Sequence, residues 1–394
     1  MGVREFLVAR RLSVNVHTWL QEYRKTANCS LIQLAAGDGT ELFSALNDMK
    51  NGIKVAMDLR RDTLRALKKK ELADESIAKL DAHLRIWLGA VFCADSIELR
   101  RVTFDTASGQ TLEKVATGDA VLQKVRSIRE LKRRLDNGRR CYGLFHSSLP
   151  SDPLAFVHVA LTSELAASLK HINVNAAELS APTHAIFYSV NSPHDALSGL
   201  DLATKVIKGA TGQVMHDFPS IRVLSTLSPI PGFMQWMSRG GGESKTWSLP
   251  QAHRATIQQV AASMGTAAAS LSSDRDMVIW VHSRVAATAD GPDGQQLVSK
   301  LQAPLTWLCA HYVAREKKRN MPLDPVARFH LRNGASLHRI NWLSNSSSQG
   351  LKVSAGLMVN YLYDLKHLDE RARKFGADGG AFHTSEEIDR LLAV

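Results

Sequence analysis

The sequence predicts a mixed α+β protein, in which a helical N-terminal region precedes a domain of alternating strands and helices. In the stretch 77–88, apolar side chains recur at the 3.6-residue spacing of a helix. These residues are Ile77, Leu80, Leu84, Trp87 and Leu88. Between residues 96 and 104 the pattern changes to the apolar and polar alternation of a half-buried strand. We therefore expect a domain boundary near residue 94, with one domain at 1–94 and the other at 95–394.

The second domain is expected to alternate strands with helices. Three strands are predicted, at 154–161, 185–190 and 221–227, because these runs are rich in Val, Ile, Phe and Tyr. A helix is expected at 200–214, where apolar side chains lie three or four positions apart. This strand, helix, strand order is typical of an α/β unit. The same helical spacing predicts helices at 121–135, 257–271 and 297–308.

Length and composition indicate a folded protein of about two domains. The 394 residues are 44% hydrophobic and 22% charged, a mixture that excludes disordered, collagen-like and fibrous chains. Lys and Arg number 49 against 38 Asp and Glu, so the formal net charge at pH 7 is +11. The chain is long enough to bury the core that an enzyme requires.

The cysteines and the termini bear on cellular location. The 4 cysteines form no C-x-x-C pair, which argues against a disulfide framework or a thiolate zinc site and favours a reducing compartment. There is no apolar run of about 18 residues, no signal-peptide core and no C-terminal peroxisomal tripeptide. We expect a protein of the cytoplasm or the mitochondrial matrix. Arg4, Arg10 and Arg11 are compatible with an organelle transit segment.

Several general catalytic motifs are absent from the sequence. It contains no G-x-x-x-x-G-K-[ST], no G-x-G-x-x-G, no H-E-x-x-H and no G-x-S-x-G. P-loop phosphate transfer, dinucleotide binding, zinc-protease chemistry and the hydrolase elbow therefore lose their usual support. The 15 histidines are scattered, so no metal site is expected.

A candidate phosphate-binding turn follows the strand that ends Phe187-Tyr188-Ser189. The segment Ser198-Gly199-Leu200-Asp201-Leu202 is expected to open the next helix. Free N–H groups and the positive end of the helix dipole make such a turn a seat for a pyrophosphate. The alternative is a capping serine beside a glycine that serves packing alone.

Three further segments carry groups capable of chemistry. Ser228 ends a strand immediately before Pro229 and Pro231, which fix its orientation. His330 stands in the segment Phe329-His330-Leu331-Arg332-Asn333-Gly334, next to a glycine turn and amide side chains that could hold one imidazole tautomer. Tyr363 ends an apolar run. Taken singly, each has a structural alternative: a Ser-Pro turn, a buried histidine and a core phenol.

Together these segments resemble the malonyl-CoA decarboxylase family. The strings FYS, SGLDLAT, SPIPGF, FHLRNGA, RINW and GLMVNYLY occur in the order of that family, and the similarity runs from about Gly39 to Lys366. The resemblance implies that the second domain has the acetyltransferase-like (GNAT) acyl-CoA fold. It also implies that the coenzyme A pyrophosphate binds at Ser198, Gly199, Leu200, Asp201, Leu202, Ala203 and Thr204.

The same resemblance implies a catalytic set of Ser228, His330, Tyr363 and Asp201. The family has Glu where Asp201 stands and Gly where Ala203 stands, so the acid is shorter and the turn more crowded. The implied reaction converts malonyl-CoA to acetyl-CoA and CO2 without cofactor or metal. Ser228 would orient the malonyl group and His330 would donate a proton, with the other two residues positioning them.

The implied partners are malonyl-CoA, acetyl-CoA and further copies of the chain, in a dimer or tetramer, with neither nucleic acid nor membrane. One alternative is an acyltransferase of the same fold, which moves an acyl group from coenzyme A to an amine. The other is a basic nucleic-acid-binding protein. Its candidate contacts are Arg126, Arg129, Lys132, Arg133, Arg134, Arg139 and Arg140.

Overall fold

The fold was analysed in a computed structural model. It describes residues 40–68, 75–118, 125, 127–136, 138–174, 181–242, 247–291, 293–378 and 380–393. Some residues named above lie outside these ranges. They are Arg4, Arg10 and Arg11 of the basic start, Gly39 at the beginning of the resemblance, Val121 of the expected helix and Arg126 of the basic cluster.

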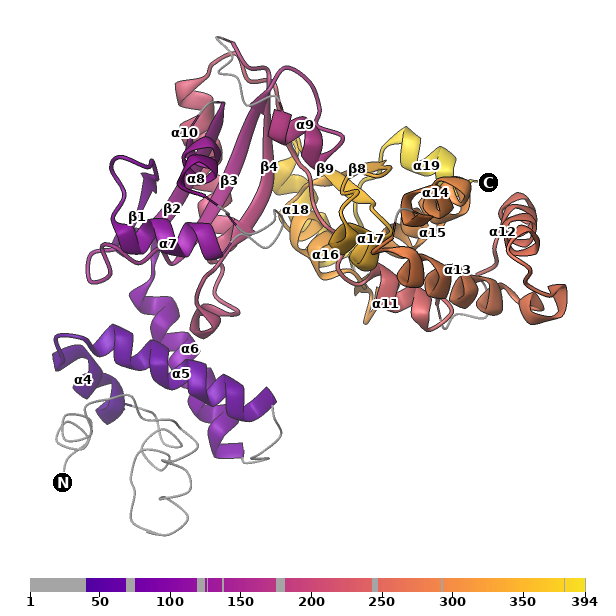
Figure 1. The fold of residues 1–394 in the computed structure, drawn as a ribbon. Helices are drawn as coiled ribbons and strands as arrows, with labels where there is room; N and C mark the ends of the chain where they lie inside the picture. Colours follow the sequence, from indigo (N-terminus) through magenta and orange to yellow (C-terminus); the bar gives the residue numbers. More distant parts are fainter. Residues whose placement is uncertain are drawn as a thin grey trace.

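The described N-terminal region is helical, as predicted. It comprises α4 (Thr40–Asp48), α5 (Gly52–Lys68) and α6 (Glu75–Val91), which Figure 1 shows beneath the end of the sheet nearest β1 and β2. The stripe expected at 77–88 lies on α6, where Leu84 and Leu88 are completely buried. Trp87 stacks on Phe43 of α4, with the ring centroids 5.8 Å apart. The apolar stripe therefore joins these helices to one another.

A mixed seven-stranded sheet forms the centre of the second domain. In the order β1-β2-β3-β4-β5-β9-β8, neighbouring strands are antiparallel, except for the parallel pair β4 and β5. The strands are β1 (Ile97–Arg101), β2 (Arg139–His146), β3 (Ala155–Thr162), β4 (His184–Asn191), β5 (Val223–Thr226), β8 (Ser336–Asn341) and β9 (Met358–Tyr363). The three strands predicted at 154–161, 185–190 and 221–227 correspond to β3, β4 and β5.

Helix α10 (Leu202–Asp217) connects the two parallel strands, preceded by the short 3-10 helix η2 (Asp195–Leu197). The predicted strand, helix, strand unit is therefore confirmed, and the helix begins at Leu202 rather than at the serine and glycine before it. The predicted fold class is also confirmed, because helices at the N-terminus precede an α/β domain that has one parallel crossover within an otherwise antiparallel sheet.

Further helices cover the sheet: α7 (Gly109–Thr117), α8 (Ile128–Leu135) and α9 (Leu169–Val174). The short 3-10 helix η1 (Ala94–Ser96) directly precedes β1. The helix expected at 121–135 corresponds to α8 and begins later than expected. Ser127 caps it, since the hydroxyl accepts a hydrogen bond from the N–H of Glu130 at 3.2 Å.

A lobe of helices is inserted between β5 and β8 (Figure 1). It holds α11 (Phe233–Ser238), α12 (Gln251–Ser263), η3 (Ala268–Leu271), α13 (Asp274–Thr288), α14 (Asp293–Lys300), α15 (Gln302–Ala314), the hairpin β6 (Lys317–Lys318) and β7 (Met321–Pro322), and α16 (Pro325–Arg332). The chain continues through α17 (Ser348–Ser354) between β8 and β9, and ends with α18 (Leu368–Ala377) and α19 (Glu386–Leu392).

Two helices predicted in this lobe are each divided in the structure. The prediction at 257–271 is wrong beyond Ser263, because Gly265 takes a φ of +73° that ends α12. The prediction at 297–308 is wrong at Leu301, where α14 gives way to α15. Pro304 in the first turn of α15 has no N–H to donate and would clash with the preceding turn of a continuous helix.

Candidate active site

Ser228 lies just beyond β5 and is fixed by the neighbouring strand β9. Its N–H donates to the carbonyl of Val359 at 2.8 Å, and its carbonyl accepts from the N–H of Val359 at 2.9 Å. Pro229 and Pro231 follow, and neither can donate a further strand hydrogen bond. The backbone of Ser228 is therefore held by two strand-type hydrogen bonds as well as by the prolines that the sequence pointed to.

His330 lies near the end of α16. The helix begins at Asp324, whose carboxylate accepts hydrogen bonds from the N–H groups of Val326 at 3.0 Å and Ala327 at 2.8 Å. Pro325 occupies the first turn, where a missing N–H costs nothing. The helix stops before Gly334, which adopts a φ of +82°. This short, firmly capped helix sets the position of the imidazole.

The structure brings Ser228, His330 and Tyr363 into direct contact. The hydroxyl oxygen of Ser228 lies 3.0 Å from Nε2 of His330. The hydroxyl of Tyr363 lies 2.8 Å from Nδ1, on the other side of the ring. Tyr361 stacks on the imidazole with the ring centroids 4.7 Å apart. Three of the four predicted catalytic residues thus form one hydrogen-bonded chain.

Burial decides the charge state of this chain. Ser228 and His330 are only 4% and 5% exposed. Removal from water disfavours imidazolium and lowers the pKa of His330 to about 3, so the ring is neutral at physiological pH. The same burial raises the pKa of Tyr363 far above its ordinary value, so the phenol keeps its proton.

The hydrogen-bond directions select one imidazole tautomer. The hydroxyl of Ser228 donates to Oγ1 of Thr226 at 2.8 Å, so the Ser228 oxygen is left to accept from the imidazole. Nε2 of His330 then carries the proton, and Nδ1 accepts from the phenol of Tyr363. The proton on Nε2 is therefore the one that faces the serine.

A buried polar network supports these groups, and sequence reasoning missed its members. Thr226 Oγ1 also accepts from the N–H of Tyr361 at 3.1 Å. The amide of Asn360 donates to the carbonyl of Thr226 at 2.6 Å and to that of Ala166 at 3.1 Å, and its oxygen accepts from Asn341 at 2.7 Å. Both asparagines stand in strings that carry the resemblance, RINW and VNY, which is the signal that could have identified them.

Asp201, the fourth predicted catalytic residue, lies at the N-cap of α10, away from the hydrogen-bonded chain. Its Oδ1 lies 2.6 Å from the hydroxyl of Thr204 and 3.6 Å from the guanidinium of Arg332. The same Thr204 hydroxyl lies 3.1 Å from Oδ1 of Asn333, at the end of α16. Asp201 thus reaches the helix that carries His330 without touching the three reactive side chains.

The turn before α10 is tied to the N-terminal helices. Buried Arg60 of α5 donates to the carbonyl of Ala196 at 2.6 Å and to that of Ser198 at 2.8 Å. Its Nε pairs with Asp81 at 3.0 Å. Gly199 has a φ of +80°, which favours glycine. No sequence signal distinguished Arg60 from other arginines, because its role depends on a contact 136 and 138 residues away.

Other predicted residues of the turn also have defined places. Leu202 and Thr204 are buried in the first turn of α10. Lys205 donates to the carbonyl of Phe92 at 2.9 Å, at the end of the N-terminal region. Ser198 and Leu200 lie in the loop before the helix, and Ala203 lies within it. All seven residues therefore belong to a single turn at the N-terminus of α10.

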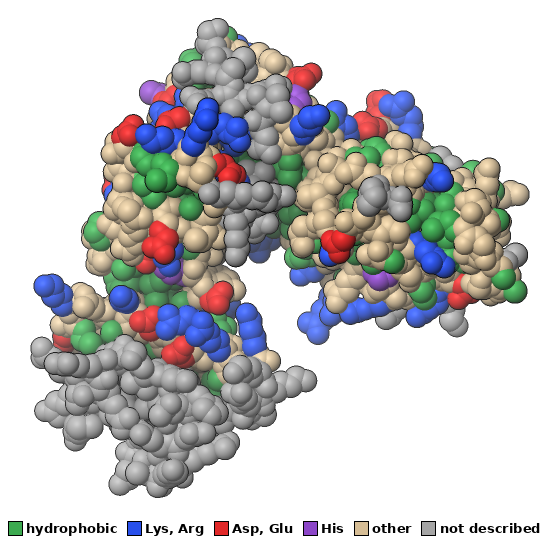
Figure 2. Space-filling model, in the orientation of Figure 1, with side chains coloured by type: hydrophobic (Ala, Val, Ile, Leu, Met, Phe, Trp, Pro, Cys, Tyr) green, Lys and Arg blue, Asp and Glu red, His purple; other side chains and the backbone are tan. Residues whose placement is uncertain are grey.

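A cavity of about 230 Å³ lies between α10, the end of β9 and α18. Tyr363 lines it, and its hydroxyl contacts His330, so the cavity adjoins the reactive residues. The other lining residues are Thr204, Ile207, Lys208, Thr211, Asn333, Leu365 and Leu368. A wider hollow opens between the N-terminal helices and the helical lobe in Figure 2, and Lys and Arg side chains gather along its edges.

The cluster suggested as a nucleic-acid contact is not one exposed surface. Arg134, Arg139 and Arg140 are buried, and Arg134 pairs with Glu130 on its own helix. Arg139 donates to the carbonyl of Ile172 at 2.7 Å. These arginines serve the packing of α8 and β2. Arg129, Lys132 and Arg133 remain exposed.

The described residues form neither a metal-ligand cluster nor a membrane-spanning helix. No group of three or more His, Cys, Asp or Glu side chains in this part of the chain is arranged to hold a metal ion. No described helix combines the length and the apolar character that crossing a lipid bilayer requires.

Two models of known protein domains match the sequence of this chain. The malonyl-CoA decarboxylase N-terminal domain model matches residues 9–92, and the C-terminal domain model matches residues 96–394. The chain belongs to the malonyl-CoA decarboxylase family. The match extends beyond the range from Gly39 to Lys366 expected from the sequence strings, at both ends.

Relatives from animals and bacteria agree with this assignment. Mitochondrial malonyl-CoA decarboxylase of Anser anser anser is 33% identical over 360 residues, 88% of this chain and 68% of the relative. The mouse protein (Mus musculus) is 32% identical over 365 residues, covering 89% and 70% of the two chains.

Solved structures of bacterial members have the same fold. A crystal structure of malonyl-CoA decarboxylase from Agrobacterium vitis matches with a TM-score of 0.73 and 26% identity, covering 99% of this chain and 89% of that one. The protein from Cupriavidus metallidurans matches with a TM-score of 0.70 and 28% identity, covering 99% and 97%. As a member of this family, the chain is a decarboxylase.

Proposed function

We propose that this protein converts malonyl-CoA to acetyl-CoA and CO2 at the chain formed by Ser228, His330 and Tyr363. One observation carries the proposal: a buried neutral imidazole, held between two hydroxyl groups, lies next to a cavity bounded by α10. The family assignment supports it. The reaction needs a proton donor in a dry site, which this arrangement supplies.

The coenzyme A moiety would bind at the turn from Ser198 to Thr204. Helix α10 has 16 residues, and the free N–H groups of its first turn favour an anion there. Arg60 would hold the backbone of this turn and not bind the phosphates itself, because its N–H groups already donate to the carbonyls of Ala196 and Ser198. Lys208, exposed and on the cavity wall, is placed to face the pantetheine or phosphate groups. The acyl end would then extend along the cavity towards Tyr363.

The chemistry at the acyl end needs no external electron acceptor. When the bond between C2 and the carboxylate breaks, its electron pair moves into the thioester carbonyl, which leaves CO2 and an enolate. In the free protein the Ser228 hydroxyl donates to Thr226, and Nε2 of His330 donates to Ser228. With substrate bound, both donors would turn to the enolate oxygen. Each oriented donor of this kind is worth on the order of 10²-fold in rate. The burial of this site also removes water from the malonyl carboxylate.

Protonation of C2 completes the reaction, which consumes one proton. The negative malonyl carboxylate raises the pKa of the nearby imidazole, so His330 takes up a proton when the substrate binds. Transfer of the Nε2 proton to C2 then gives the acetyl group and leaves a neutral imidazole with its proton on Nδ1. Proton exchange with solvent then restores the Nε2 tautomer of the free protein. The hydroxyl of Tyr363 holds the ring at Nδ1: its oxygen accepts from that nitrogen when the imidazole is protonated, and its O–H donates to it in the free protein. Asp201 would position α16 through Thr204 and Arg332.

The remaining expectations are part of this proposal. The reaction would proceed without cofactor or metal, because the thioester itself accepts the electron pair. The chain would act as a homo-oligomer, in the cytoplasm or the mitochondrial matrix. Two family models that meet between residues 92 and 96 support a catalytic domain at 95–394 after a helical domain at 1–94.

The decisive experiment mixes the purified chain with malonyl-CoA in a chelator-treated buffer without an amine acceptor. Acetyl-CoA and CO2 should then form in equal amounts, as followed by chromatography and by trapping of labelled CO2. Release of free coenzyme A that requires an added amine would instead indicate the acyltransferase. Formation of neither product, by protein shown to be folded, would overturn the proposed function.

A further inference from the structure

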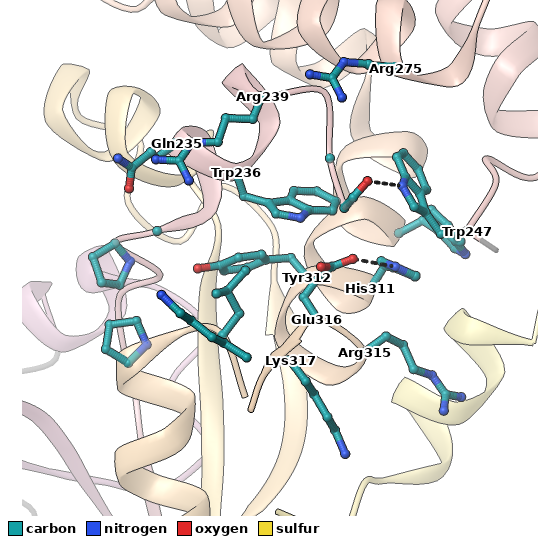
Figure 3. A pocket seen from close by; sticks show the side chains of 18 of the residues that line it. Gln235, Trp236, Arg239, Trp247, Arg275, His311, Tyr312, Arg315, Glu316 and Lys317 are labelled. Carbon is teal, nitrogen blue, oxygen red and sulfur yellow. Dashed lines mark hydrogen bonds and ion pairs between the residues drawn. The ribbon is translucent and has the colours of Figure 1, made fainter. Parts of the chain in front are cut away.

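A second, larger cavity lies in the helical lobe. Its volume is about 1220 Å³, above the roughly 300–1,000 Å³ that usually holds a drug-sized ligand. Its walls come from α11 and the Gly-rich segment after it, from α13, and from α15 and the chain that follows (Figure 3). None of its described lining residues also lines the cavity beside Tyr363. This is therefore a separate site, which the decarboxylation mechanism does not use.

Positive charge dominates the lining of this cavity. Five basic residues take part: Arg239, Arg275, Arg315, Lys317 and Lys318. All five are exposed, and none forms an ion pair within the described part of the chain. Among the lining residues that the structure describes, one is acidic: Glu316, which lies 3.2 Å from Nε2 of His311. Like charges gathered from three segments repel one another, and a bound anion relieves that repulsion.

The cavity is constructed around aromatic rings and a glycine segment. Trp236 packs on Trp247, with the ring centroids 6.0 Å apart, between the basic groups above and below in Figure 3. Gly240 and Gly241 have φ values of +82° and +86°. A Cβ on Gly240 would come 2.2 Å from Cγ of Arg275, and one on Gly241 would come 2.4 Å from a ring carbon of Trp247. The wall therefore depends on glycine, which gives the stretch Arg239-Gly240-Gly241-Gly242 a structural reason.

The types of cation indicate the class of anion. Three of the five are arginines, whose planar guanidinium groups match phosphate oxygens in a bidentate manner. In Figure 3, Arg239 and Arg275 lie on one side of the aromatic rings, while Arg315 and Lys317 lie on the other. Cations on both sides of the rings favour a ligand with several linked phosphates over a single small anion.

We infer that this cavity binds a ligand that carries two or more phosphate groups. Nucleotides, inorganic polyphosphate and the phosphorylated adenosine part of a second coenzyme A share this chemistry. The aromatic wall favours a ligand that also has a planar ring, through contact with the indole of half-buried Trp247.

Tryptophan fluorescence tests the inference without any use of turnover. Three of the 7 tryptophans line the cavity: Trp236, Trp247 and Trp307. The full-length chain is titrated with tripolyphosphate, ADP and inorganic phosphate at constant ionic strength, and dialysis counts bound coenzyme A. We expect saturable binding of tripolyphosphate or ADP, with inorganic phosphate weaker by roughly tenfold or more. Whichever of tripolyphosphate, ADP or a second coenzyme A per chain binds most tightly identifies the source.

Charge-reversed variants locate the binding. Arg275→Glu and Arg315→Glu, on opposite walls, should each weaken binding by roughly tenfold or more. The control is Arg129→Glu, the same change at an exposed position of α8. Equal binding by all three variants would overturn the inference. A glutamate oligomer that binds as tightly as tripolyphosphate would reject the phosphate class. None of these outcomes depends on whether the protein decarboxylates malonyl-CoA.

Discussion

The hydroxyl of Tyr363 lies 2.8 Å from Nδ1 of His330, on the side of the ring opposite the serine. This contact determines which imidazole nitrogen can deliver a proton. Because the phenol stays protonated, it donates to Nδ1 and leaves the proton on Nε2. The tyrosine therefore holds the tautomer that the proposed mechanism needs, and substitutions on either side of the ring should have different consequences.

Replacing His330 with Asn should abolish the formation of acetyl-CoA while coenzyme A binding is retained. The amide fills similar space but supplies no titratable proton. Tyr363→Phe should be milder and lower kcat by roughly 10- to 100-fold, because the ring loses its fixed tautomer but keeps its acid. Steady-state kinetics and calorimetric coenzyme A binding measure both effects. His338→Asn, on β8, is the matched control, and unchanged turnover in His330→Asn would remove this residue from the mechanism.

Ser228→Ala should lower kcat by about 10²-fold with little change in thermal stability, since the lost group is a donor to the developing enolate. The comparison is Ser225→Ala, three residues earlier in the sequence and on β5. Ser225 is fully buried, and its hydroxyl donates to the carbonyl of Tyr361 at 3.0 Å. That change should cost about 1 kcal/mol of stability and leave kcat near the wild-type value. Equal losses of kcat in both variants would indicate general damage to β5 instead.

The pH dependence of stability should reveal the neutral state of His330. Burial lowers the pKa of this group in the folded protein to about 3, below that of an unfolded histidine. Between that value and about 6.5, the unfolded chain binds more protons than the folded one. Stability should therefore fall as pH falls through this window, with a slope of up to about 1.4 kcal/mol per pH unit from this group. Urea unfolding of wild type and His330→Asn at several pH values measures the difference, and parallel curves would contradict it.

Asp201→Ala should reduce kcat by roughly tenfold and leave coenzyme A affinity nearly unchanged. The reason is that Asp201 contacts α16 through Thr204 and Arg332 and does not reach the reactive groups. Both members of its ion pair are more than half exposed, so the change should have little effect on stability. Asp201→Glu, which keeps the charge, should recover most of the rate. A loss of coenzyme A binding in place of kcat would assign Asp201 to the phosphate turn alone.

Arg60→Met should raise KM for malonyl-CoA more than it lowers kcat, because two carbonyls of the turn before α10 lose their donor. Arg60→Lys keeps the charge but cannot donate to Ala196, Ser198 and Asp81 in the same fork, so it should lie between Met and wild type. Arg65→Met, an exposed position of the same helix, provides the control. A lower melting temperature with an unchanged KM would mean that Arg60 serves folding only.

Periodicity predicted the helix α6, and a high content of Val, Ile, Phe and Tyr predicted β3 and β4. β3 was found although all eight of its residues are buried. β2 is equally buried but was not predicted, because Arg139 and Arg140 interrupt any apolar signal. Those arginines had instead suggested a nucleic-acid contact, since a sequence does not show that a charged side chain is buried against a carbonyl such as that of Ile172.

The site itself could be assembled from the sequence only through the resemblance. Ser228 and His330 are 102 residues apart, and no local spacing relates them. The family strings predicted that both residues belong to one site, and in the structure the Ser228 oxygen lies 3.0 Å from Nε2 of His330. Thr226 and Arg60 had no such signal. The first is one of many strand threonines, and the second acts from a helix that precedes the reactive domain.

The sheet order has a consequence for synthesis on the ribosome. β5 pairs with β9, and the hydroxyl of Ser225 donates a hydrogen bond to the carbonyl of Tyr361, 136 positions later in the sequence. Until β9 has emerged, the growing polypeptide has an open edge at β5, and the serine lacks its backbone partner Val359. A chain that ends before β9 is therefore inactive. The open edge of β5 is the part of such a chain that most needs a chaperone.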